Sequence, residues 1–303
     1  MTGSEPDRAG GELLRALGAI ADSPADARTA GRALGLPEIS AAEHTEVFVL
    51  NCPPHASVYL GPEGGLGGEG TDRVAGFWRV IGLVPPREPD HLTTLLSLYA
   101  ALGEAASDAA GDTAAGAATG PPGLADRLGR AREVLFNEHL WPWLPGYLDA
   151  VAELGSPGLA AWAALTTRAL VAERAVTKAG PLPLALRAAP EPVSADAPLA
   201  DLAAALTTPI RSGLIVTRQR LRDGAGAAGT GYRIGERRFA LRSMLEQDPG
   251  PTLGWLAGQA RDWSRRHAER APGDPAGTWW SERAAHTARM LLAAAERASA
   301  TVG

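Results

Sequence analysis

Apolar residues recur along most of the chain at the spacing of an α-helix rather than at the alternate spacing of a strand. Leu92, Leu95 and Leu96 begin one such stripe, and Tyr99 and Leu102 continue it. A stripe with this period marks the buried face of an amphipathic helix. Over the first 175 residues no alternating run of β-branched residues competes with the helical pattern, so we predict an all-α bundle. Helices are expected within residues 10–35, 41–50, 71–82, 90–102, 124–140, 146–154 and 157–170, with further helical patterns at 216–221, 237–245, 253–268 and 279–298.

Two segments poor in large apolar residues interrupt this pattern. Residues 103–122 are almost wholly Ala, Gly, Asp and Thr, and residues 178–198 are rich in Pro and Ala. Such compositions are typical of linkers. We predict an all-helical N-terminal domain over residues 10–177, with the first linker inside it, and a smaller, mostly helical, Arg-rich module over residues 199–303.

The composition excludes several kinds of chemistry. The basic residues are 28 Arg and a single Lys, Lys178, which no Gly precedes, so the Gly-Lys-Ser/Thr of a nucleotide-binding P-loop is missing. Cys52 is the only Cys, which excludes an intrachain disulfide and a Cys-rich metal site. The sequence has neither a His-Glu-x-x-His nor a Gly-x-Ser-x-Gly motif. We predict no catalytic residues, no metal ligands and no enzymatic activity.

The distribution of apolar residues also bears on localisation. No uninterrupted apolar run reaches the roughly 18 residues of a spanning helix, so membrane insertion is not expected. The first residues are acidic and lack the basic-then-apolar layout of a signal peptide. We expect a cytoplasmic protein.

Charge is unevenly divided along the chain. Residues 1–180 carry 22 acidic and 13 basic residues, a net charge of −9, and residues 181–303 carry 12 and 16, a net charge of +4. An acidic domain favours cationic partners and opposes nucleic acid. Eight Arg against two acidic residues lie between Arg211 and Arg242. They indicate either a nucleic-acid- or phosphate-binding regulator or docking of the C-terminal module onto the acidic domain; we favour docking, and so expect no nucleic-acid partner.

The motif Glu88-Pro89-Asp90-His91 has two interpretations. In the structural one, Pro89 keeps the chain extended and Asp90 caps the following helix. In the functional one, Glu88, Asp90 and His91 form a compact anionic surface at the mouth of that helix. Carboxylates bind guanidinium groups in bidentate fashion, so this surface would suit an arginine-bearing peptide.

A second motif, His139 to Pro145, places Trp141 and Trp143 on either side of a proline. Two such tryptophans fill the core at a tight corner, or, when partly exposed, form an apolar groove on which a peptide helix can lie. Both interpretations stay open at the level of sequence.

Glu88-Pro89-Asp90-His91 resembles the E-P-D-H signature of the TorD/DmsD/NarJ family of redox-enzyme maturation chaperones. Three further motifs of that family are matched in the same order, within residues 10–177. They are a proline-led Ser-x-Tyr stretch (Pro53 to Tyr59), an aromatic helix ending in Gly-Leu (Phe77 to Leu83, with Trp78), and a Phe-x-x-His-Leu and Trp motif (Phe136, His139, Leu140 and Trp143). Residues 180–303 lie outside the resemblance.

The resemblance implies a TorD-like helical bundle followed by an extra C-terminal module. It implies a chaperone that binds the N-terminal leader, often a twin-arginine (Tat) signal peptide, of the catalytic subunit of a molybdopterin-containing oxidoreductase. Such a chaperone assists cofactor insertion and assembly before export and holds no permanently bound cofactor. The expected client-binding residues are Glu88, Pro89, Asp90, His91, Tyr59, Trp78, His139 and Trp143.

The arginine density of the C-terminal module raises one further possibility for a ligand. Arg237, Arg238 and Arg242 lie within one helical pattern, and clustered arginines bind phosphate groups. We therefore expect any transient contact with the phosphate-bearing molybdopterin cofactor at these three residues.

Overall fold

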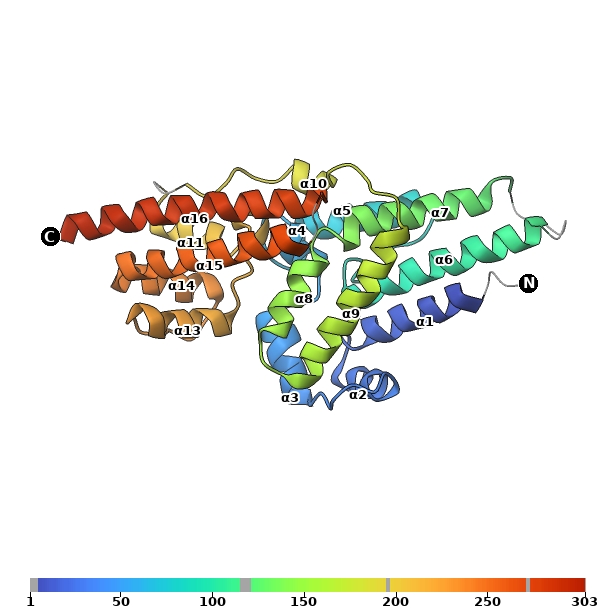
Figure 1. The fold of residues 1–303 in the computed structure, drawn as a ribbon, viewed down its shortest axis with the longest axis horizontal. Coiled ribbons are helices and arrows are strands. Elements are labelled where there is room, and N and C mark those ends of the chain that lie inside the picture. The colour runs from blue at the N-terminus through green and yellow to red at the C-terminus, as the bar shows by residue number, and fades with distance from the viewer. Residues whose placement is uncertain (1–4, 115–120, 195–196, 271–272, 303) are drawn as a thin grey trace. The chain divides into compact units, whose positions relative to one another are not determined.

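The computed structural model describes residues 5–114, 121–194, 197–270 and 273–302. All the regular elements in these ranges are helices, and none is a strand (Figure 1). This confirms the predicted all-α class.

The chain divides into two compact units. Unit 1 comprises Met1–Ala56 and Thr71–Gly180, and unit 2 comprises Ser57–Gly70 and Pro181–Gly303. The sequence analysis assigned residues 57–70 to the N-terminal domain, whereas the structure groups them with the C-terminal residues. The predicted domain limits therefore do not coincide with the two units.

Unit 1 is a bundle in which α1 packs against α6 and α9, α6 packs against α7, and α8 packs against α9. Trp162 of α9 lies at its centre, where its indole Nε1 donates a hydrogen bond of 2.9 Å to the carbonyl of Leu17 in α1. Its helices are α1 (Glu5–Ala19), α2 (Pro24–Ala33), α3 (Ala41–His44), α5 (Gly68–Val80, which begins in residues 57–70), α6 (Leu92–Ala114), α7 (Leu124–Val134), α8 (Leu144–Ala152) and α9 (Pro157–Val176), with π-helical turns η1 (Thr45–Asn51) and η2 (Leu135–Leu140).

Local sequence signals place several helix starts correctly. At the start of α9 the hydroxyl of Ser156 accepts a hydrogen bond from the backbone N–H of Leu159, and Pro157 occupies the first turn, where its missing N–H has no cost. Ser40 and Glu43 form a reciprocal capping box at α3. These caps fix where the helices begin before any tertiary contact forms.

The predicted linker over residues 103–122 is wrong for its first half, because α6 continues to Ala114. Ala is the strongest helix former, and Gly103 lets the side chain of Arg132 lie close to α6: a Cβ at this glycine would be 3.1 Å from the Nε atom of Arg132. A small residue at this position thus serves packing between α6 and α7. Residues 115–120 of the predicted linker lie outside the described residues.

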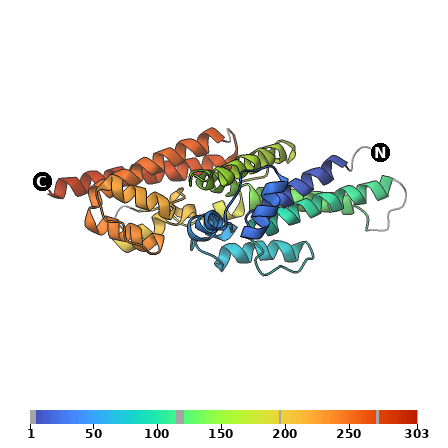
Figure 2. The ribbon, with the colours of Figure 1, turned by 90° about the horizontal axis from the view of Figure 1, so that it is seen from below.

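Unit 2 is built around a helical hairpin formed by α15 (Pro249–Arg270) and α16 (Pro275–Val302), which run side by side in both ribbon views (Figures 1 and 2). Its shorter helices are α4 (Ala56–Leu60, whose first residue is in unit 1), α10 (Leu184–Arg187), α11 (Leu199–Leu206), α12 (Pro209–Ser212), α13 (Arg218–Ala228) and α14 (Arg237–Gln247). The helical patterns predicted after residue 216 correspond to α13 to α16.

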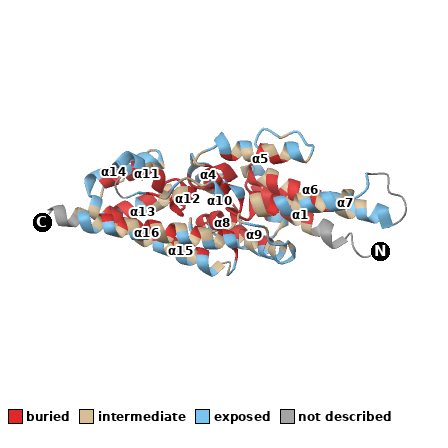
Figure 3. Cartoon of the chain, turned by 90° about the horizontal axis from the view of Figure 1, so that it is seen from above, coloured by how far each residue is buried: buried red, intermediate tan, exposed pale blue. Residues whose placement is uncertain are grey.

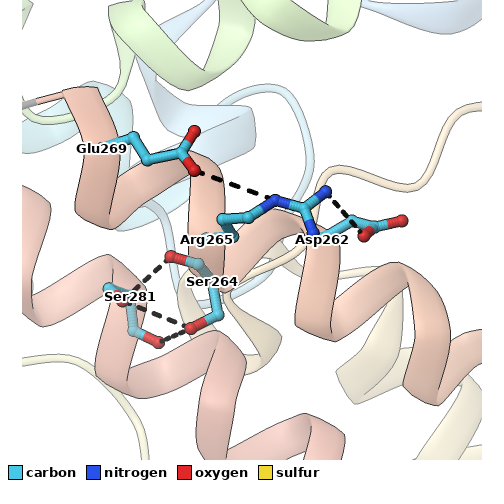
Figure 4. Close-up of polar contacts among 5 residues, drawn as sticks. All are labelled: Asp262, Ser264, Arg265, Glu269 and Ser281. Carbon is cyan, nitrogen blue, oxygen red and sulfur yellow. Dashed lines mark hydrogen bonds and ion pairs between the residues drawn. The ribbon is translucent and has the colours of Figure 1, made fainter.

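Polar contacts join the two helices of the hairpin near the turn that connects them. Ser264 Oγ donates to the carbonyl of Ser281 at 3.0 Å, and Ser281 Oγ donates to the carbonyl of Ser264 at 2.9 Å (Figure 4). On the outer face of α15, Arg265 pairs with Asp262 at 3.1 Å and lies 3.9 Å from Glu269. The serine pair is the part of this network that links the helices.

Much of the segment predicted as the linker 178–198 packs into unit 2. It contains α10, and Ala185, Leu186 and Val193 are buried. The guanidinium of Arg283 in α16 donates to the carbonyl of Pro190 at 2.9 Å. Prolines interrupt the helices in this segment, but several of its side chains are nevertheless buried in the core of unit 2.

Two glycines in unit 2 allow close backbone approach. Gly213 adopts a left-handed conformation (φ +77°), and a Cβ there would lie 2.5 Å from the backbone nitrogen of Ala284 in α16. Gly64, also left-handed, would bring a Cβ within 2.8 Å of the hydroxyl of Thr208. The latter contact packs the 57–70 segment against the turn between α11 and α12.

Candidate functional site

Two extended segments of unit 1 meet in front of α6 and hold the Glu88–His91 motif in place. The backbone N–H of Ala56 donates to the carbonyl of Asp90 at 3.0 Å, and that of Leu92 donates to the carbonyl of Pro54 at 2.8 Å. This antiparallel pairing fixes the motif against residues 54–56, which lie more than 30 positions away in the sequence.

The pairing places two imidazoles side by side. His55 and His91 face each other across the bridge, with ring centroids 4.7 Å apart, and Glu88 Oε1 lies 4.0 Å from His55 Nε2. Burial lowers the pKa of both histidines, while the charges of Asp90 and Glu88 oppose that shift. Both rings are therefore mainly neutral at pH 7, and they add no positive charge beside Glu88.

His91 also caps α6. The helix starts at Leu92, so His91 rather than Asp90 occupies the N-cap position. The ring Nδ1 of His91 accepts a hydrogen bond of 3.3 Å from the backbone N–H of Thr93. The predicted cap at Asp90 is therefore one residue too early.

The predicted anionic surface of Glu88, Asp90 and His91 is not formed, because only Glu88 is exposed. The side chain of Glu88 is 63% exposed, whereas Asp90 is 2% exposed and His91 is also buried. The backbone of Asp90 is paired with the 54–56 segment, and this pairing encloses the residue. A partner approaching from solvent therefore meets one carboxylate here, on a turn braced by the two buried residues.

An exposed apolar strip leads from the end of α5 to Glu88. Gly82 (φ +83°) ends α5 in a Schellman motif, in which the N–H of Leu83 donates to the carbonyl of Trp78 at 2.9 Å. Apolar side chains on both sides of this glycine face solvent. Val80 is 85% exposed and Val84 is 88% exposed, and Figure 3 colours α5 mostly as exposed or intermediate. We call Val80, Leu83 and Val84 the apolar strip.

Among the predicted client-binding residues, six are buried and Trp78 is half-buried. Those buried are Tyr59, Pro89, Asp90, His91, His139 and Trp143.

Trp143 and His139 belong to the core of unit 1. The indole Nε1 of Trp143 donates to the carbonyl of His139 at 2.8 Å, and the ring of His139 lies 5.2 Å from that of Phe77. Burial, assisted by the charge of Arg73, lowers the pKa of His139 to about 4. The core interpretation of the Trp-Pro-Trp corner is thus confirmed, since Trp141 and Trp143 are both buried.

Sequence reasoning missed two features of this site. His55 was included only as part of a family-like stretch, and its pairing with His91 is a contact between distant segments that no local pattern reveals. The apolar strip had a signal: apolar residues follow the helix-ending glycine, and Pro85 and Pro86 then prevent them from continuing a helix.

Unit 1 also has a pocket of about 330 Å³ between α6, α7 and the end of α9. The guanidinium of Arg132 lies 4.4 Å from the ring centroid of Tyr99 and donates to Glu173 at 2.9 Å. The hydroxyl of Tyr99 donates to the same carboxylate oxygen at 2.8 Å. None of the predicted client-binding residues lines this pocket.

The three arginines predicted to contact phosphate differ in their contacts within unit 2. Arg237 donates to the carbonyl of Val216 at 3.0 Å, and Arg242 pairs with Glu246 at 2.7 Å. Arg238 is exposed and has no hydrogen-bond or ion-pair partner in the described part of unit 2. The contact with the molybdopterin cofactor stays a prediction.

The described residues contain neither a metal-binding cluster nor a candidate membrane span. No group of three His, Cys, Asp or Glu side chains is arranged to hold a metal ion. None of the helices described combines the length and the apolar character needed to cross a bilayer.

The family model described as nitrate reductase delta subunit matches residues 11–149. Searches of the curated proteins and of the solved structures found no match.

Proposed function

Since residues 11–149 belong to the nitrate reductase delta subunit family, whose members are redox-enzyme maturation chaperones, we propose that this chain binds the N-terminal leader of a molybdopterin oxidoreductase subunit. It holds the apo-subunit in the cytoplasm while the cofactor is inserted, before assembly and export. It acts by non-covalent binding, and no covalent bond is made or broken.

The observation that carries this proposal is the apolar strip beside Glu88. A leader peptide combines a basic segment with an apolar one. Val80 and Val84 are almost fully exposed, and they offer an apolar surface at the point where the chain reaches the exposed carboxylate of Glu88. Glu88 follows Val84 by only four residues, so one peptide can contact both the apolar strip and the carboxylate.

The charge of the site favours the basic part of such a peptide. A carboxylate accepts two parallel hydrogen bonds from one guanidinium, and such charge-assisted bonds are about twice as strong as neutral ones. The neighbouring imidazoles are neutral at pH 7 because burial lowers the pKa of His55 and of His91. They therefore add no positive charge that would repel an arginine.

The buried residues of the motif have a positioning role in this proposal. Asp90 and His91 hold the turn that carries Glu88, through the paired backbone and the cap of α6. Their substitution is expected to disturb the turn and the fold around it, so they are poor probes of client binding. Glu88 and the apolar strip are the surface residues to test.

The test measures binding of a fluorescein-labelled peptide of about 25 residues, with two adjacent arginines before an apolar stretch, by fluorescence anisotropy. Glu88→Gln is expected to weaken binding about tenfold, since a hydrogen bond to a charged group contributes about 1.5–3 kcal/mol. Leu83→Ser combined with Val84→Ser should weaken it by a similar factor, because apolar surface is no longer buried.

Two substitutions of exposed unit 1 residues provide matched controls. Glu38→Gln removes an exposed carboxylate and Val171→Ser an exposed apolar side chain, and neither should change the dissociation constant. Replacement of both arginines of the peptide by glutamine should abolish the difference between the native chain and Glu88→Gln. Unchanged binding by Glu88→Gln and by the strip variant would refute the proposal.

A further inference from the structure

A second exposed surface lies in unit 2, on the loop between α13 and α14. The loop is held at one end by Gln247 of α14, whose side-chain oxygen accepts from the N–H of Gly231 at 2.8 Å and whose amide donates to the carbonyl of Gly231 at 3.0 Å. The guanidinium of Arg222 lies 5.5 Å from the ring centroid of Tyr232. These contacts fix the course of the loop.

The other end of the loop is closed by Phe239 in the first turn of α14. A Cβ at Gly235 would lie 3.0 Å from Cδ1 of this ring, so the ring lies directly against the loop backbone. Arg237 anchors the same turn through its hydrogen bond to the carbonyl of Val216. The side chains that the loop presents to solvent are thus carried on a braced backbone.

Four of these side chains, Arg233, Ile234, Arg238 and Phe239, form what we call the basic-apolar surface. Ile234 is 89% exposed and Phe239 is 49% exposed. Arg233 and Arg238 are exposed, and neither guanidinium has a hydrogen-bond or ion-pair partner in the described part of the chain. In the sequence, Ile234 and Phe239 each come directly after one of these two unpartnered arginines.

The charge around this surface is strongly positive. Residues 229–242 contain four arginines and one glutamate, a net charge of +3. Two of those arginines, Arg237 and Arg242, have internal partners, which leaves Arg233 and Arg238 to attract an external anion. A partner that fits must therefore be negatively charged and must also accept one protruding and one half-exposed apolar side chain.

We propose that the basic-apolar surface docks the protein on an anionic lipid membrane. Basic side chains near an anionic leaflet are attracted by its surface potential, and adjacent apolar side chains are buried at the boundary between headgroups and acyl chains. A side chain as exposed as Ile234 makes almost no contact with its own protein. A fluid bilayer accepts such a protruding group without a preformed pocket, whereas a protein partner needs one.

Nucleic acid fits the same surface less well. Its backbone would pair with the arginines but would leave Ile234 in water, because phosphate and sugar groups offer it no apolar environment. The docking proposed here is attachment to the membrane surface and involves no spanning segment. It is independent of the leader-binding surface of unit 1.

The experiment is co-sedimentation of the full chain with phosphatidylcholine vesicles, with and without phosphatidylglycerol, at low and at high salt. Binding is expected only with phosphatidylglycerol and should weaken as salt is raised. Arg233→Gln with Arg238→Gln should reduce the partition coefficient about 25-fold, at about fivefold for each arginine near an anionic surface. Ile234→Ser with Phe239→Ser should reduce it at least tenfold.

Matched controls come from exposed positions elsewhere in unit 2. Arg261→Gln with Arg289→Gln removes two exposed arginines of the α15–α16 hairpin, and Leu199→Ser removes an exposed apolar side chain; neither should change sedimentation. Circular dichroism should show the same helix content for every variant.

Several outcomes would overturn the proposal. One is sedimentation that does not depend on phosphatidylglycerol, and another is that the double variants bind vesicles as the native chain does. The third is that the native chain binds a DNA duplex but not vesicles, and that the same variants lose the DNA binding. Leader-peptide binding by the docking variants should be unchanged, so a failure here and a failure of the proposed function remain distinguishable.

Discussion

His139 gives a prediction that tests whether this family-motif residue belongs to the core. Its ring is buried against Phe77, and burial lowers its pKa to about 4. A histidine in the unfolded chain has a pKa of about 6.5, the value in model peptides. The unfolded state therefore takes up a proton at a higher pH than the folded state. The stability that neutral His139 permits is complete above pH 6.5 and is lost progressively as the pH falls towards 4.

The size of the loss follows from the two pKa values. At pH 5 the unfolded imidazole is almost fully protonated, since its pKa lies about 1.5 units above the pH, while the folded imidazole remains about nine-tenths neutral. At about 1.4 kcal/mol for each pKa unit, His139 lowers the free energy of unfolding by about 2 kcal/mol between pH 7 and pH 5. His139→Phe keeps a flat ring of similar size and removes the titrating group, so this part of the loss should vanish.

The assay is urea unfolding of the native chain and of His139→Phe at pH 7, 6 and 5, followed by tryptophan fluorescence. Other groups titrate in both proteins, and the difference between the two curves isolates His139. NMR titration of the ring measures its folded pKa directly. An equal loss of stability in both proteins between pH 7 and pH 5, or a ring that titrates near 6.5 in the folded state, would refute the reasoning.

Two further predictions concern unit 2. Gly213→Ala should lower the free energy of unfolding by about 3 kcal/mol, because an alanine is strained at φ +77° and its Cβ would meet the backbone of Ala284. Gly254→Ala should raise it by about 0.5–1 kcal/mol, since nothing lies within 4 Å of the added Cβ. Thermal unfolding measures both changes, and equal effects of the two substitutions would contradict the packing described. In a double-mutant cycle, Ser264→Ala and Ser281→Ala should show a coupling energy of about 0.5–1 kcal/mol, and a coupling of zero would mean that the serine pair does not join the hairpin.

The parts of the fold that the sequence predicted well are those decided by local chemistry. The start of α9 follows from Ser156 and Pro157, whose side chains act within one turn of the chain. The end of α5 likewise follows from Gly82, which adopts the left-handed conformation that ends a helix.

The parts that could not be predicted depend on contacts between distant residues. Composition indicated a linker after residue 102, whereas packing of Arg132 against Gly103 makes a small residue suitable within a helix. The burial of Asp90 follows from pairing with the segment around Ala56, and a motif with two carboxylates gives no sign of which one faces solvent. Sequence reasoning thus overestimated how many charges of this motif a partner can reach, since only Glu88 is exposed.

The membership of residues 57–70 in unit 2 has a consequence for how the molecule can be divided. The chain leaves unit 1, contributes this segment to unit 2, and returns before α6 begins. A single protease cut near residue 180 would therefore not release two intact halves: the C-terminal fragment would lack the stretch that packs Gly64 on Thr208, and the N-terminal fragment would carry that stretch without its neighbours. Studying either unit alone calls for excision and religation of this interleaved segment.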